Sequence, residues 1–104
     1  MKNVAFRMKL KPGVVEEYRR RHDQLWPELA VALREAGIYD YSIFLDEETL
    51  HLFAVLKLRE PNKREQLPSQ PVMRRWWDYM ADLMETHPDH RPREWALIPM
   101  FHFD

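Results

Sequence analysis

The sequence predicts an α+β fold, a ferredoxin-like βαββαβ sandwich, from the periodicity of its apolar residues. Apolar and polar side chains alternate in residues 4–10 and 39–45, and residues 50–59 are nearly continuous in apolar side chains, as expected of β-strands. Residues 15–36 and 72–84 instead repeat apolar side chains at helical spacing. With a last extended segment near the C-terminus, two right-handed crossovers give a four-stranded antiparallel sheet with both helices on one face.

The first strand leads through a Lys-Pro-Gly turn at residues 11–13 into the first helix, which Gly37 ends. The buried face of the strand is expected to carry Val4, Phe6, Met8 and Leu10. Pro27 lies inside the helix. It lacks an N–H donor and disfavours helical geometry at Trp26, so a bend or a break is expected there.

The second and third strands are predicted to form a hairpin through residues 46–49. Residues 62–66 favour a helical turn, and the second helix is expected to start near Ser69. Residues 95–103 have extended, aromatic-rich character, and their internal Pro99 suits an edge strand or a bulge.

The arrangement leaves one face of the sheet uncovered. Since the third strand is apolar on both sides, we expect burial on both faces, and hence a homodimer formed sheet to sheet.

The amino-acid composition narrows the classes of protein to which the chain can belong. The 104 residues suit one domain, residues 1–104. With 16 Lys and Arg against 17 Asp and Glu, the net charge is −1, so neither nucleic acid nor an anionic membrane is an expected partner. The chain has no cysteine and starts without a signal peptide or membrane span, so we expect a cytoplasmic protein. It has 2 glycines and no phosphate-binding glycine-rich loop.

The candidate for proton transfer is His22, near the middle of the apolar stripe of the first helix, four residues after Tyr18. An imidazole changes charge near physiological pH and can act as an acid or a base. The alternative is a core histidine bonded to Tyr18 or to the backbone.

In the predicted topology Tyr18, His22, Tyr41 and Trp76 converge between the helices and the sheet, with Trp77 at the edge of its helix face as a pocket rim. Phenol hydroxyls and flat indoles match what a sugar needs, which is polar contacts for its hydroxyls and an aromatic face for its C–H surface. The alternative is that Trp76 and Tyr41 only fill the core.

Other chemistries find less support. Asp23 and Glu28 are expected to point away from the stripe, which disfavours the paired carboxylates of a glycoside hydrolase. His87 and His90 flank Asp89 in a polar loop, but their spacing is loose, and no metal site is assigned. No serine has the sequence context of an activated nucleophile.

Several runs together closely resemble the L-rhamnose mutarotase family, nearly from end to end. These runs are residues 16–22, 26–29, 39–43 with 45–46, and 72–80. The resemblance implies a dimeric α+β barrel of ferredoxin-like units, with His22 as the proton donor and Tyr18, Tyr41, Trp76 and Trp77 as substrate contacts. The loop at 87–92 departs from the asparagine-rich loop of the family, so no sugar contact is assigned to it.

The resemblance implies an isomerase that interconverts the α and β anomers of L-rhamnose or a related 6-deoxy sugar. Ring opening and closure need proton transfers but no cofactor, and the second proton carrier is not assigned by the sequence. The alternatives are a cofactor-free monooxygenase or haem-degrading enzyme on a similar barrel, and a non-catalytic sugar-binding module.

Overall fold

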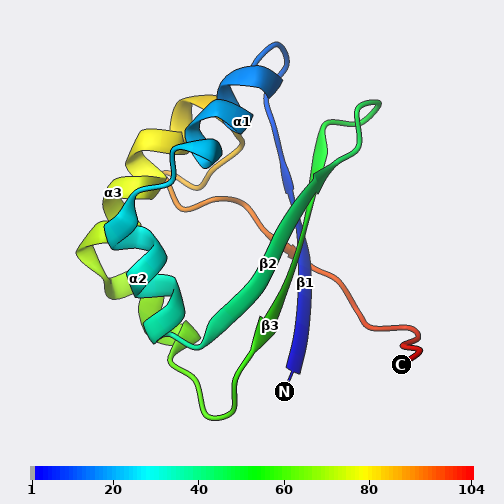
Figure 1. Ribbon diagram of the computed structural model, residues 1–104. Helices are drawn as coiled ribbons and strands as arrows, with labels where there is room; N and C mark the ends of the chain where they lie inside the picture. The colour runs from blue at the N-terminus through cyan, green and yellow to red at the C-terminus, as the bar shows by residue number, and fades with distance from the viewer. Residues whose placement is uncertain (1) are drawn as a thin grey trace.

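A four-stranded antiparallel sheet forms one layer of the molecule and the helices form the other, in the computed structural model, which describes residues 2–104 (Figure 1). The strands are β1 (Lys2–Lys9), β2 (Ile38–Leu45), β3 (His51–Leu58) and β4 (Trp95–Ala96), in the order β2-β3-β1-β4. The helices are α1 (Val15–Asp23), α2 (Pro27–Glu35) and α3 (Pro71–Met80), with 3₁₀ turns η1 (Arg64–Ser69) and η2 (Ala81–Leu83). This strand order, with the helices on one face, confirms the predicted ferredoxin-like fold.

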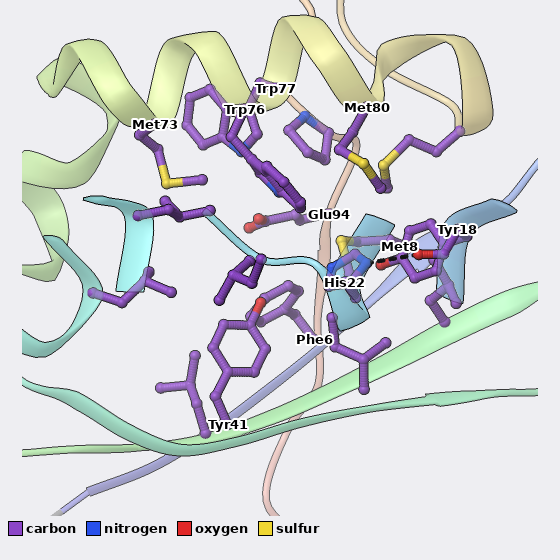
Figure 2. Close-up of a pocket in the computed structure, with 18 of the residues that line it drawn as sticks. Phe6, Met8, Tyr18, His22, Tyr41, Met73, Trp76, Trp77, Met80 and Glu94 are labelled. Carbon is purple, nitrogen blue, oxygen red and sulfur yellow. Dashed lines mark hydrogen bonds between the residues drawn. The ribbon is translucent and has the colours of Figure 1, made fainter. Parts of the chain in front are cut away.

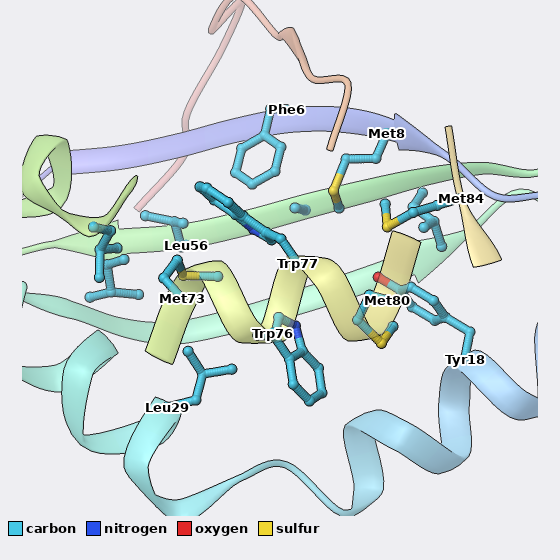
Figure 3. Packing of buried hydrophobic residues seen from close by; sticks show 14 of the residues in the cluster. Phe6, Met8, Tyr18, Leu29, Leu56, Met73, Trp76, Trp77, Met80 and Met84 are labelled. Carbon is cyan, nitrogen blue, oxygen red and sulfur yellow. The ribbon is translucent and has the colours of Figure 1, made fainter. Parts of the chain in front are cut away.

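The core lies between the sheet and the helices, as the alternation predicts (Figure 3). On β1, Phe6 and Met8 are buried, and Leu10 just after the strand is 1% exposed. β3 contributes every second residue to the same layer: Leu52, Ala54, Leu56 and Leu58. From the other side α3 contributes Met73, Trp76, Trp77 and Met80.

The first helical region is two helices, because Pro27 breaks it. Trp26 has extended dihedral angles (φ −62°, ψ 130°), as expected of a residue before proline, and Pro27 takes the first position of α2, where it needs no donor. The chain thus turns between α1 and α2, and the last turn of α1 carries His22. Gly37 follows the end of α2 with φ +92°, as predicted.

The outer face of the sheet is open within this chain. Phe44 is 62% exposed and Val55 is 42% exposed, and the register pairs Phe44 with Phe53 and Val55 with Ser42 on this face. The prediction that β3 is buried on both faces is therefore wrong for the chain by itself.

The last strand is shorter than predicted: pairing is limited to Trp95–Ala96, with one further bond from the Leu97 N–H to the Ala5 carbonyl (3.0 Å). Pro99 ends the pairing with β1, because the next backbone N–H directed toward β1 would be that of residue 99, and proline has no N–H. The following residues run out beyond the sheet (Figure 1), and Phe101 and Phe103 are each 85% exposed.

Within residues 2–104, no helix has both the length and the apolar character that crossing a membrane requires.

Candidate active site

His22 lies in the last turn of α1 and is partly buried. Its Nδ1 atom is 3.0 Å from the main-chain carbonyl oxygen of Tyr18 (Figure 2). A carbonyl oxygen only accepts hydrogen bonds, so Nδ1 carries a hydrogen and donates it. This leaves Nε2 as the atom that can exchange a proton. The hydrogen bond to the backbone is the contact expected of a core histidine, and it is compatible with a catalytic role because Nε2 stays free.

Burial lowers the pKa of His22 from its ordinary value of 6.5, against the opposing effects of the Tyr18 carbonyl and the charge of Asp23. The imidazole ring also packs on aromatic neighbours. Its centroid is 4.4 Å from that of Tyr18 and 5.5 Å from that of Trp76, which meets it edge-on at 89°. The imidazole is therefore fixed in orientation by one hydrogen bond and two rings.

Both indoles of α3 are buried, Trp76 at 6% exposure and Trp77 at 9%. Trp76 extends toward the α1–α2 connection, where it meets Trp26 at 5.0 Å, whereas Trp77 extends toward Phe6 and the sheet (Figure 3). The prediction of Trp77 at the edge of its helix face is wrong. Consecutive helical residues differ by about 100° in direction, and α3 is enclosed on both sides, by the helices and by the sheet.

Tyr41 reaches the same region because it alternates with Ile43 and Leu45 on the inner face of β2, and an irregularity in the strand turns Tyr39, not Tyr41, to the outer face. The register against β3 shifts between Tyr39 and Ser42, and Asp40 has φ +49°. Tyr39 then pairs with Lys57 on the outer face, while Tyr41 stands on the inner face (Figure 2). Unbroken alternation would put both tyrosines on one face. Tyr18 is 8% exposed and Tyr41 is 37% exposed. Desolvation of the hydroxyl raises the pKa of each, so both hydroxyls stay protonated and can donate hydrogen bonds.

These side chains line one cavity of about 850 Å³ between the helices and the sheet. Pockets for small ligands commonly measure roughly 300–1,000 Å³. All five residues predicted for the site contribute to its walls: Tyr18, His22, Tyr41, Trp76 and Trp77. The walls are mostly apolar, with a few polar groups facing inward.

Three carboxylates line the cavity, Asp23, Glu65 and Glu94, and none of them is predicted to do so from the sequence. Asp23, expected to point away, lines the cavity because α1 ends there. Glu94 also lines the cavity and was not considered (Figure 2). It precedes β4, where Trp95 pairs with Arg7 on the outer face, so alternation directs Glu94 to the inner face. That alternation is readable in the sequence once the start of β4 is known.

The remaining candidates have structural partners. Glu28 accepts a hydrogen bond from Arg75 (3.2 Å), consistent with a surface position. His90 pairs with Asp78 at 2.9 Å, and Asp89 lies 3.7 Å from Arg74. Among residues 2–104, no group of three or more histidine or carboxylate side chains is placed to hold a metal ion.

The fold and the cavity define a small α+β domain with a small-molecule site between its helices and its sheet. A model of the L-rhamnose mutarotase family matches residues 3–103. The chain is 64% identical over 104 residues to the L-rhamnose mutarotase of Burkholderia cenocepacia, covering 100% of both chains. It is 54% identical over 102 residues to that of Jannaschia sp., covering 98% of each. This chain belongs to the L-rhamnose mutarotase family.

A solved structure agrees with this assignment. The crystal structure of the L-rhamnose mutarotase from Formosa agariphila matches with a TM-score of 0.93 and 41% identity, over 100% of both chains. The similarity thus extends over the whole fold.

Proposed function

We propose that this protein is an isomerase that interconverts the α and β anomers of L-rhamnose, with His22 as the proton donor. The observation that carries the proposal is the exchangeable Nε2 of His22, an imidazole that lines a cavity of about 850 Å³ walled by indoles and phenols. Membership of the L-rhamnose mutarotase family names the sugar.

The chemistry needs two proton transfers in each direction. For opening, the imidazolium of His22 donates its Nε2 proton to the ring oxygen O5 as the C1–O5 bond breaks, while a second proton carrier takes the proton of the anomeric hydroxyl, which becomes the carbonyl of the open sugar. The C1 aldehyde then rotates. For closure, O5 attacks the other face of C1, its proton returns to Nε2, and the carbonyl oxygen regains a proton. The lowered pKa of His22 makes the protonated ring a readier donor.

The other four residues are proposed to bind the sugar. Trp76 and Trp77 offer apolar faces for its C–H surface and its methyl group, and they exclude water. Tyr18 and Tyr41 keep their hydroxyl protons and so offer hydrogen bonds to sugar hydroxyls.

The comparisons do not favour the two alternatives from the sequence analysis. The family model and the relatives carry the mutarotase name rather than that of an oxygenase, a haem-degrading enzyme or a sugar sensor.

Saturation-transfer NMR tests the proposal. One anomeric proton of L-rhamnose is saturated, and transfer to the other anomeric proton is followed with and without protein. We expect transfer that grows with protein concentration, and weaker transfer for other 6-deoxy sugars such as L-fucose. Sugar binding without faster exchange would favour the binding module, and a Soret band after haem addition without any effect on sugars would favour the haem enzyme.

We also propose a homodimer formed through the open face of the sheet. Phe44 and Val55 expose apolar surface there, and the C-terminal segment exposes Ile98, Met100, Phe101 and Phe103. A second copy would cover apolar area that is costly to leave in water. Light scattering coupled to size-exclusion chromatography should give the mass of two chains, and Phe44→Glu should shift it toward one chain. A wild-type monomer at micromolar concentration would contradict the dimer.

A further inference from the structure

Glu94 is a carboxylate that the proposed reaction has not used, although it points into the cavity. Figure 2 shows it beneath Trp77 and above the ring of Tyr41, with His22 to one side. The electrostatic influence of Glu94 on Tyr41, and of Tyr41 on Tyr18, agrees with this closeness. Glu94 therefore belongs to the same site as the imidazole, although it comes from the opposite end of the chain.

No hydrogen bond or ion pair engages the Glu94 carboxylate within the described part of the chain. The charged groups that act on it are Arg64 of η1 and Arg91 and His87 of the neighbouring loop. Their charges lower its pKa, but desolvation of the carboxylate raises the pKa by more, although the residue as a whole is exposed. Such a carboxylate has its lone pairs available for a ligand.

We propose that Glu94 is the second proton carrier of this site, exchanging a proton with the anomeric hydroxyl while His22 serves the ring oxygen. The inference rests on the proposed function, since it assigns the partner that this reaction requires. It adds a catalytic residue to those predicted from the sequence.

The ring-opening step conserves one proton that His22 and Glu94 share. Before opening, His22 holds this proton and Glu94 is ionised. As C1–O5 breaks, O5 takes the proton of Nε2, and Glu94 takes the proton of O1–H. His22 is then neutral and Glu94 is a carboxylic acid. Closure on the other face of C1 returns both protons, and the net charge of the cavity stays constant throughout.

Glu94 is an exposed residue at the mouth of the cavity, whereas His22 is partly buried, and desolvation acts on their charged groups in opposite senses, which suits this exchange. Desolvation lowers the pKa of His22 from 6.5 and raises the pKa of Glu94 from 4.5, so the two affinities for a proton approach each other. The transfer of a proton from His22 to Glu94 by way of the sugar then needs only a small change in free energy.

Tyr18 and Tyr41 are less suited as the base, because desolvation raises their pKa values further from neutrality. Asp23 and Glu65 are the competing carboxylates, since both also line the cavity. Asp23 follows His22 directly on the same helix end, and its negative charge raises the pKa of that imidazole. The experiment must therefore separate Glu94 from Asp23 and from Glu65.

The test measures kcat, KM and the pH profile of L-rhamnose anomer exchange for the wild type and for Glu94→Gln, Glu94→Asp, Asp23→Asn and Glu65→Gln, and loss of one ionisation in Glu65→Gln would overturn the inference as it would in Asp23→Asn. Glu85→Gln is the matched control, because Glu85 is exposed, as Glu94 is, but does not line the cavity. We expect Glu94→Gln to lower kcat about 100-fold, within the range of a lost proton-transfer group, with KM changed less than about threefold. Glu94→Asp should recover part of kcat.

The pH profile distinguishes a proton carrier from a structural residue. The wild type should show two ionisations in kcat, and Glu94→Gln should show one. Unchanged kcat and two ionisations in Glu94→Gln, or loss of one ionisation in Asp23→Asn instead, would overturn the inference. If Glu94→Gln fails to fold, full wild-type kcat in Glu94→Asp overturns it. A wild type that does not accelerate exchange overturns the proposed function as well, so the two failures are distinguishable.

Discussion

The Nδ1 atom of His22 lies 3.0 Å from the main-chain carbonyl oxygen of Tyr18, one turn earlier on α1. This bond fixes which imidazole nitrogen is free, because the carbonyl can only accept. The backbone thereby sets the tautomer, while the rings of Tyr18 and Trp76 pack against the imidazole. The proton-transfer atom of the site is Nε2 as a consequence.

The position of His22 predicts a titration midpoint below 6.5 in the folded protein, because burial disfavours the imidazolium. NMR chemical shifts of the ring protons against pH measure the midpoint, with His22→Ala used to assign the signals. A midpoint at or above 6.5 would mean that the ring is better solvated or more strongly paired than the structure indicates.

The lowered pKa of His22 also determines how the free energy of unfolding changes with pH. Between the folded pKa of His22 and 6.5 the unfolded chain binds more protons than the folded chain, so the free energy of unfolding rises with pH in this window. The contribution of His22 is constant above about pH 6.5, and stability is lost as pH falls from 6.5 to the folded pKa, below which the contribution is constant again. Urea unfolding of wild type and His22→Ala at several pH values isolates this slope.

Trp76 is predicted to act mainly in substrate binding. It is buried, and its indole meets both His22 and Trp26 edge-on. Trp76→Phe keeps an apolar ring but offers the sugar a smaller aromatic face. KM should therefore rise about 3- to 10-fold, and kcat should change less. This rise corresponds to a loss of about 0.5–1.5 kcal/mol of aromatic contact. Steady-state anomer exchange measures both constants. The control is Trp95→Phe, because Trp95 lies on the outer face over Arg7, and an equal change in both variants would contradict the assignment.

Gly37 is predicted to be the less replaceable of the two glycines. Both have positive φ, +79° at Gly13 and +92° at Gly37, so alanine at either should cost about 1–3 kcal/mol in backbone strain. At Gly37 an added Cβ would also lie 2.9 Å from the Cβ of Asn62, whereas nothing lies within 4 Å at Gly13. Urea unfolding should therefore show a larger loss for Gly37→Ala than for Gly13→Ala. Equal losses would mean that Asn62 yields freely.

Much of the fold follows from local rules. The alternation of Phe6, Met8 and Leu10 predicts the inner face of β1, and Pro27 predicts the break before α2. These succeed because periodicity and proline geometry depend on nearby residues alone. The convergence of His22 and Tyr41 follows once the topology is inferred.

The failures come from features that depend on distant parts of the chain. The bulge around Asp40 separates Tyr39 from Tyr41, and only pairing with β3 reveals it. Glu94 enters the cavity because Trp95 pairs with Arg7, a contact about ninety residues apart in sequence. The C-terminal segment looks like a strand by composition, but Pro99 stops its pairing with β1.

The most direct test of the central claim, that the imidazole of His22 transfers a proton to a sugar in the cavity, is saturation transfer between the anomeric protons of L-rhamnose with His22→Ala. The matched control is His102→Ala, since His102 is an exposed residue of the C-terminal segment. We predict that His22→Ala lowers the catalysed exchange rate by about 10²- to 10⁴-fold and that His102→Ala leaves it unchanged. Wild-type exchange in a folded His22→Ala variant would contradict the account.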